Sequence, residues 1–187
     1  MNFDLSCTNV PAPDGKLIKR FEIIKPILEA DGIINACKLK THLFTYITGA
    51  TKNTFGVIPG IEKATFHSRL PEPDDFSEML VDLNEIVRPN LHIMDAVVAM
   101  EGNRPNAGKT RKIGAILASE NYAALDAVAC RLVSIPPLDV GVIRAAVGRG
   151  ILKEDLSDVK IVGEDIEDLA IRDFKRPKSY LDAARSQ

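Results

Sequence analysis

Two lysines and a histidine stand at every second position after an apolar stretch of the sequence. Lys38, Lys40 and His42 follow the stretch from Gly32 to Cys37. Side chains on a β-strand alternate between its two faces, so an extended backbone places these three groups on one face. Two ammonium groups suit a carboxylate or phosphate, and an imidazole that titrates near neutral pH can move a proton. We expect an anion site here, and the alternative is a solvated basic edge.

A second polar stretch, from Thr48 to Gly56, surrounds Lys52 and Asn53 with glycine and hydroxyl side chains. A stretch of this composition can turn backbone amides toward an anion. It lacks the Gly-x4-Gly-Lys-Ser/Thr spacing of a P-loop, so that kind of nucleotide site is excluded. An ordinary polar loop is the alternative.

Carboxylates accompany a third apolar stretch. Asp95 interrupts the stretch from Leu91 to Met100, and Glu101, Gly102 and Asn103 follow it. Burial of an unpaired carboxylate is costly, so we expect Asp95 to be buried with a cationic partner or a raised pKa. A lysine of the first two stretches is the natural partner. A purely structural ion pair is the alternative.

Other reactive residue types give weaker signals. Asp126 stands near the start of an expected helix, where the helix dipole explains it, and His67 and His92 stand alone. The sequence has three cysteines, far apart: Cys7, Cys37 and Cys130. They cannot ligate an iron-sulfur cluster or structural zinc from this chain alone, and we expect neither cofactor in it. No metal-ligand spacing and no common hydrolase or dinucleotide-binding motif is present.

Apolar stretches alternate with helical patterns along the chain. Strands are expected at residues 17–24, 32–37, 91–100, 113–118 and 159–163, and helices at 75–87, 123–133 and 138–147. Nearly continuous apolar strands are typical of sheets covered on both faces. We predict an α/β three-layer sandwich with a largely parallel or mixed sheet. Residues 1–187 are expected to form one domain, with an irregular arm over 1–16 and a charged C-terminal tail over 166–187.

The composition excludes several classes of protein. The 24 Lys and Arg residues against 26 Asp and Glu residues give a formal charge of -2, and aromatic residues make up only 5%. This composition offers neither a phosphate track nor a stacking platform for nucleic acid. No apolar stretch approaches the length of a membrane span, and the first residues do not resemble a secretory signal. We expect a cytoplasmic protein that binds neither nucleic acid nor membrane.

These stretches together resemble the bacterial and archaeal family named domain of unknown function 362. The resemblance spans about residues 15–165 and rests on these segments: Glu29-Ala30-Asp31-Gly32-Ile33-Ile34-Asn35, Lys38-Leu39-Lys40-Thr41-His42, Thr48-Gly49-Ala50-Thr51-Lys52-Asn53 with Gly56, Met94-Asp95-Ala96, Met100-Glu101-Gly102-Asn103, Ala118-Ser119 and Ala124-Leu125-Asp126. Members of that family often carry a ferredoxin-type iron-sulfur module, and their reaction is not established. The resemblance therefore implies a link to anaerobic redox metabolism and an iron-sulfur protein as a candidate partner.

The chain departs from the family pattern in three ways. Relatives have a further N-terminal segment, which implies a shortened form here or a variant that completes its sheet by association. The cysteine-rich module is missing, so cluster binding does not transfer. Arg104 replaces a small residue before Pro105, and Asn121-Tyr122 stands where Asp-Pro is usual.

Two functions from different classes follow. The first is a domain that binds a small anionic molecule. Such a domain would be an enzyme of redox metabolism or the remnant of one. Its expected ligand-binding residues are Lys38, Lys40, Lys52, Asn53, Gly102 and Asn103, and its expected catalytic residues are His42, Asp95 and Glu101. The second is a non-catalytic module that forms a homo-oligomer or docks onto an iron-sulfur protein.

Overall fold

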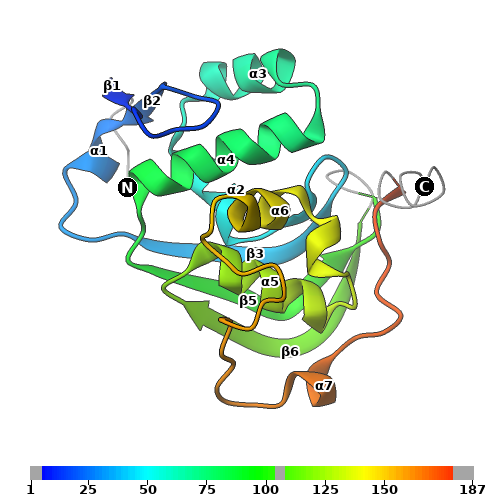
Figure 1. The fold of residues 1–187 in the computed structure, drawn as a ribbon. Helices are drawn as coiled ribbons and strands as arrows, with labels where there is room; N and C mark the ends of the chain where they lie inside the picture. The colour runs from blue at the N-terminus through cyan, green and yellow to red at the C-terminus, as the bar shows by residue number, and fades with distance from the viewer. Residues whose placement is uncertain (1–5, 104–107, 179–187) are drawn as a thin grey trace.

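The computed structural model describes residues 6–103 and 108–178, which build a four-stranded sheet with helices packed against it (Figure 1). The strands lie in the order β4-β3-β5-β6, with bounds Tyr46–Thr48, Ile34–His42, Leu91–Glu101 and Lys109–Ser119. The β3–β5 pair is parallel, and the two outer pairs are antiparallel. The predicted α/β class with a mixed sheet is confirmed.

Seven helices accompany the sheet in the described residues: α1 Lys25–Leu28, α2 Ala50–Asn53, α3 Gly60–Arg69, α4 Pro73–Val87, α5 Tyr122–Leu132, α6 Gly141–Gly148 and α7 Ile166–Leu169. Short 3-10 turns cover Thr54–Val57 and Pro137–Asp139. The longest helix, α4, starts with proline and two aspartates, which suit a helix N-terminus, and ends where Arg88 adopts a φ of 46°.

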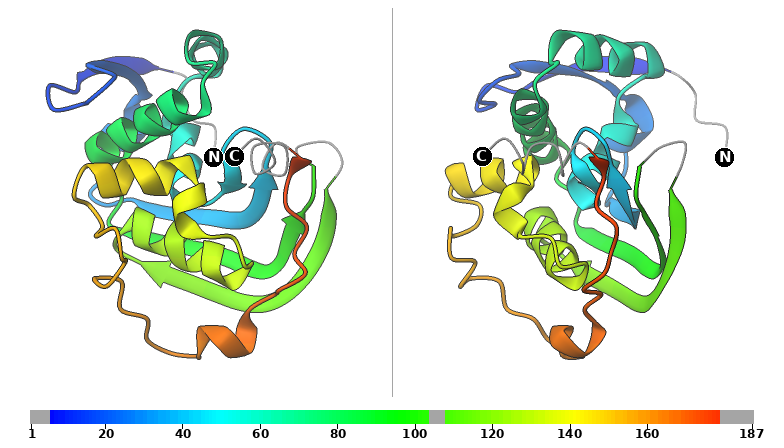
Figure 2. Two further views of the ribbon diagram at one scale, coloured as in Figure 1. Left: turned by 45° about the vertical axis from the view of Figure 1, so that its right-hand side comes forward. Right: turned by 90° about the vertical axis from the view of Figure 1, so that its right-hand side faces the viewer.

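The layers follow from which elements contact each other. Helices α2 and α5 pack on the sheet, and α4 and α6 pack on α2 and α5. Figure 2 shows α5 and α6 on one side of the sheet, whereas no helix of the described residues covers the other side. The sheet is therefore an outer layer of the sandwich, and we call its uncovered side the open face.

Alternation along β3 shows which residues point to each side. Asn35, Cys37, Leu39 and Thr41 are buried toward the helices, whereas Ile34 on the open face is 64% exposed. One hydrophobic core runs from the sheet through the helices. That the whole chain forms a single domain stays a prediction.

The predicted irregular arm over residues 1–16 is wrong for residues 7–11. Cys7–Pro11 forms strand β1, which pairs antiparallel with β2, Arg20–Ile24, and residues 1–5 lie outside the described part. The loop between these strands is held by long-range contacts: the buried Asp82 carboxylate accepts the backbone N–H groups of Lys16, Leu17 and Ile18 at 2.6, 2.9 and 2.7 Å. Those contacts explain why β2 starts three residues later than the sequence pattern predicts.

The predicted charged tail over residues 166–187 contains regular and buried structure in its described part. Within the described residues it contains α7 and a buried Phe174, and it runs beside the ends of β5 and β6 (Figures 1 and 2). Residues 179–187 lie outside the described part. The strand predicted at 159–163 is wrong, because these residues form a loop without a sheet partner among the described strands.

Candidate functional site

Strand β3 points Lys38, Lys40 and His42 to the same side of the sheet, as the alternation predicts, with Lys38 exposed and Lys40 and His42 half-buried. The pairing with β5 shifts register between Lys38 and Lys40, yet the alternation of buried and exposed residues continues to the end of the strand. On the other edge, Lys40 lies opposite Thr48 of β4. Directly opposed residues of an antiparallel pair project to the same face, so Thr48 shares the face of Lys40.

Asp126 of α5 fixes the segment that carries Lys52. Its buried carboxylate accepts the backbone N–H groups of Ala50 and Thr51 at 2.6 and 3.0 Å, and the Thr51 hydroxyl at 2.6 Å. A Cβ atom on Gly49 would lie 2.0 Å from the Asp126 Oδ1, so only glycine lets the two segments approach this closely. The N-terminus of α2 is therefore occupied by a side chain of the protein itself.

A network of side-chain amides attaches α2 to β3. Asn53 donates to the Asn35 Oδ1 at 2.6 Å and to the Ala36 carbonyl at 3.1 Å, and Asn35 donates to the Ala50 carbonyl at 2.9 Å. The Asn35 amide also lies 3.0 Å from the Nδ1 of His92. Asn53, an expected ligand-binding residue, is thus engaged in orienting α2 along the edge of β3.

Five basic side chains on β3, α2 and α3 are linked by the effects of their charges on one another, and we call them the cationic cluster: Lys40, His42, Lys52, Lys63 and His67. Burial lowers the pKa of Lys52, and the charges of Lys40 and Lys63 lower it further. Burial also lowers the pKa of His67, with Lys52 adding to the effect. Lys40 and Lys52 have no ion-pair or hydrogen-bond partner for their ammonium groups in the described part of the chain.

His42 is a neutral group in this cluster. Burial, followed by the charges of Lys52, His67 and Lys40, lowers its pKa to about 4, rather than the near-neutral value that the sequence predicts. Its Nδ1 lies 3.1 and 3.3 Å from the backbone N–H groups of Phe44 and Thr45, which donate to it. The proton of the neutral ring therefore sits on Nε2, and the ring is a hydrogen-bond donor at pH 7.

Aromatic rings border the cluster on the side of α4. His67 stacks on Phe76 with ring centres 4.6 Å apart, and the rings of Phe44 and Phe55 meet it edge-on at 5.9 Å. Lys63 and His67 were not predicted from the sequence as members of an anion site. Their i, i+4 spacing on α3 was the available signal, because it places both on one helix face.

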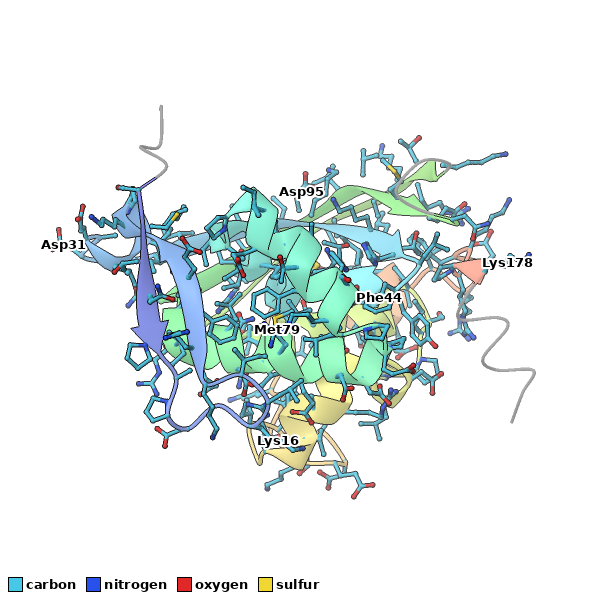
Figure 3. All side chains as sticks on the ribbon, turned by 90° about the horizontal axis from the view of Figure 1, so that it is seen from above. Lys16, Asp31, Phe44, Met79, Asp95 and Lys178 are labelled. Atoms are coloured by element: carbon cyan, nitrogen blue, oxygen red, sulfur yellow. The ribbon has the colours of Figure 1, made fainter. Side chains whose placement is uncertain are left out.

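The expected partner of Asp95 is correct, but its expected burial is wrong. Its carboxylate accepts a 2.6 Å bond from Lys38, with the two side chains 50% and 45% exposed. Figure 3 shows Asp95 on the side of the sheet opposite α6. The hydrogen bond from Lys38, together with the Val97 N–H, lowers the pKa of Asp95, so it is an anion at neutral pH and a poor general acid.

The residues after β5 bind the chain's own C-terminal segment. The buried Glu101 carboxylate accepts the backbone N–H of Lys175 at 3.1 Å, and the Gly102 N–H donates to the Lys175 carbonyl at 2.8 Å. Asn103 accepts the backbone N–H of Lys178, the residue labelled at the chain's last described turn in Figure 3. The structure therefore does not bring Glu101 to the open face with Asp95 and His42.

Residues 6–103 and 108–178 contain no group of three or more His, Cys, Asp or Glu side chains that could hold a metal ion. Within the same residues, no helix has the length and apolar character needed to cross a membrane.

Comparison with known proteins gives the family. The family described as "Domain of unknown function (DUF362)" matches residues 2–131. The chain belongs to this family. It is 35% identical over 130 residues to the thylakoid-associated protein sll1697 of Synechocystis sp. (strain ATCC 27184 / PCC 6803 / Kazusa), and this alignment covers 69% of the chain and 40% of that relative. No solved structure matches the chain. The matched residues contain the whole cationic cluster of this DUF362 member.

The anchoring of α2 predicts the effect of removing its cap. Asp126→Ala leaves two backbone N–H groups and a hydroxyl buried without an acceptor, and we expect a loss of about 3 kcal/mol in the free energy of unfolding. Asp165 caps the exposed helix α7 through one bond to the Glu167 N–H, so Asp165→Ala is a matched control with a loss of about 1 kcal/mol or less. Urea unfolding measures both, and equal losses would contradict the role given to Asp126.

The electrostatics of the cluster predict the titration of His42. Its folded pKa lies below the unfolded value, so protonation opposes folding and His42 disfavours the folded state progressively as the pH falls from about 6.5 to about 4. In NMR titrations, we expect His42 to titrate near pH 4 and Lys52→Gln to raise that pKa. The exposed substitution Lys160→Gln should leave it unchanged. A His42 pKa near 6.5 in the unmodified chain would contradict the cluster.

Proposed function

We propose that this chain binds a small anion, a phosphate or a carboxylate, through its cationic cluster. The ligand receives hydrogen bonds from the ammonium groups of Lys40 and Lys52 and from the Nε2–H of neutral His42. Lys63 and His67 add positive potential from α3.

The observation that carries the proposal is the contrast between neighbouring lysines on one strand. Lys38 is paired with Asp95, whereas Lys40 lies beside Lys52 and the charges that act on His42 and Lys52 are all basic. Like charges brought together at a half-buried place raise the free energy of the fold, and a bound anion removes that repulsion. Half-buried ammonium groups are also partly desolvated, which strengthens their attraction to an anion.

A further polar atom supports the same assignment. The Thr48 hydroxyl is buried and has no hydrogen-bond partner among the described residues. Because Thr48 lies opposite Lys40, its unused hydrogen-bonding capacity is on the face that carries the cluster. Unsatisfied buried hydroxyls are uncommon in proteins and call for an explanation.

We propose anion binding and not catalysis, because the other expected site residues have hydrogen-bond or ion-pair partners within the protein. Lys38 is paired with Asp95, Asn53 orients α2, and Glu101 and Asn103 hold the C-terminal segment. The catalytic roles of His42, Asp95 and Glu101 stay predictions, as does that of Gly102 in ligand binding.

The cellular context of the chain also stays a prediction. The name of the relative associates that protein with thylakoids, whereas the sequence predicts a cytoplasmic protein without membrane binding. An iron-sulfur protein partner rests on the family resemblance alone. Anion binding requires neither a particular cellular location nor an iron-sulfur protein partner.

Titration calorimetry with inorganic phosphate, and separately with acetate, tests the proposal. We expect saturable binding of one of them at low ionic strength, weakened at least about tenfold by Lys52→Gln and by Lys40→Gln, since each removes a charge-assisted hydrogen bond. The exposed Lys160→Gln is the matched control and keeps the affinity of the unmodified chain. Absence of binding, or an affinity unchanged in both cluster variants, would overturn the proposal. The two ligands distinguish a phosphate site from a carboxylate site.

A further inference from the structure

The turn that follows β5 binds the C-terminal segment through its backbone. We call residues 171–178 the strap, which runs past the ends of β5 and β6, and residues 101–103 the clamp (Figure 2). The Glu101 carboxylate accepts the backbone N–H of Lys175 at 3.1 Å, and the Gly102 N–H donates to the carbonyl of the same residue at 2.8 Å. The Lys175 side chain is exposed. These two bonds therefore depend on the peptide backbone and not on the lysine side chain.

Two buried side chains add a sequence pattern to this backbone contact. Phe174 and Pro177 are buried, and Phe174 belongs to the apolar core. Directly after Pro177, the backbone N–H of Lys178 donates to the Asn103 side chain at 2.7 Å. Residues 174–177 form neither helix nor strand. The clamp and the core beside it thus fit a non-helical peptide with an aromatic residue three positions before a proline.

The sheet, rather than the strap, fixes the clamp. At the end of β3, the Thr41 hydroxyl donates to the Gly102 carbonyl at 2.6 Å, and Gly102 adopts a φ of 84°, a conformation that favours glycine. Glu101 is buried and is the last residue of β5. The clamp therefore lies where the parallel strands β3 and β5 end, which is the usual place for a ligand in open α/β sheets.

The strap is attached more weakly than the helices that pack on the sheet. Between α6 and the strap, a stretch that the structure describes throughout, α7 is the only helix or strand. Arg176 donates to the Ser134 carbonyl, and Asp173 pairs with Arg111, but the Asp173 side chain is 75% exposed and such a pair adds little stability. Segments of this kind open at a lower free energy than the core. Opening removes the donor from the buried Glu101 carboxylate, and the N–H of another peptide replaces it.

We propose that the clamp is a peptide-binding site and that the strap is its displaceable internal occupant. The partner is a segment of another protein that has an aromatic residue three positions before a proline and whose backbone binds Glu101 and Gly102. A tethered segment has an effective concentration that reaches the order of millimolar, so the strap competes with any outside peptide. The family match, over residues 2–131, contains the clamp and ends before the strap. The site does not depend on anion binding, because no clamp residue belongs to the cationic cluster.

Fluorescence anisotropy with a labelled peptide of the sequence of residues 171–178 tests the site on the full chain. Lys175→Pro removes the N–H that Glu101 accepts and releases the strap, so this variant should bind the peptide at least about tenfold more tightly than the unmodified chain does. Lys175→Gln is the matched control: it keeps the N–H, changes only an exposed side chain and should bind the peptide like the unmodified chain. Phe174→Ser is a second variant that releases the strap, through a different contact. Circular dichroism verifies the fold of each variant, and hydrogen exchange of the strap amides verifies release.

Changes in the peptide test how it is recognised. Replacing its phenylalanine by serine, or methylating the backbone nitrogen at the position of Lys175, should weaken binding to the Lys175→Pro chain at least about tenfold, since each removes one of the contacts described above. Equal affinities of the three peptides would overturn the proposal. It would also be overturned by a released strap without peptide binding, by equal affinities of the released and unmodified chains, or by a strap that stays protected from exchange in Lys175→Pro.

Discussion

The carboxylate of Asp126 accepts two backbone N–H groups and a hydroxyl from a segment 75 residues earlier in the chain. Burial raises the pKa of this carboxyl to about 6, and the three donors counteract part of the rise. Without it, α2 would have an uncapped, buried N-terminus and no fixed position on the edge of β3. With it, Lys52 is held close enough to Lys40 for the two charges to repel each other. The cationic cluster depends on this contact.

Packing supplies the stability that such a cluster needs. A large apolar core joins the sheet to α2, α5, α4 and α6, and the polar contacts beside it, which include the Asn35–Asn53 bond, attach α2 to β3. A structure fixed in this way can keep basic groups together in the absence of a ligand. Under the proposed function, its preorganised donors would bind an anion without reordering, which is how fixed dipoles and charges act in binding sites.

Short-range patterns predicted much of this structure. The period of two after residue 37 correctly placed Lys38, Lys40 and His42 on one face, and the isolated carboxylate in an apolar strand correctly indicated a lysine partner for Asp95. The long helix α4 was also predicted, because its apolar residues repeat with helical spacing and its ends carry the usual signals. These features depend on neighbours in sequence or on the alternation of a strand.

Contacts between distant segments were beyond the sequence patterns. Glu101 and Asn103 were interpreted as ligand-binding residues. No local sequence pattern shows that the backbone N–H groups of Lys175 and Lys178 donate to them. Asp126 was interpreted as a carboxylate stabilised by the dipole of its own helix, α5, although it caps the N-terminus of α2. Asp95 was expected to be buried because apolar strands are usually covered on both faces, and here one face is open.

The site is tested most directly by NMR of the histidine side chains during a phosphate titration. The chain has three histidines, of which His42 and His67 belong to the cationic cluster and His92 is buried beside Asn35. The account predicts saturable shifts of the His42 and His67 ring resonances, with a rise in the pKa of His42, and an unmoved His92. Unchanged resonances of His42 and His67, or equal shifts in all three rings, would contradict it.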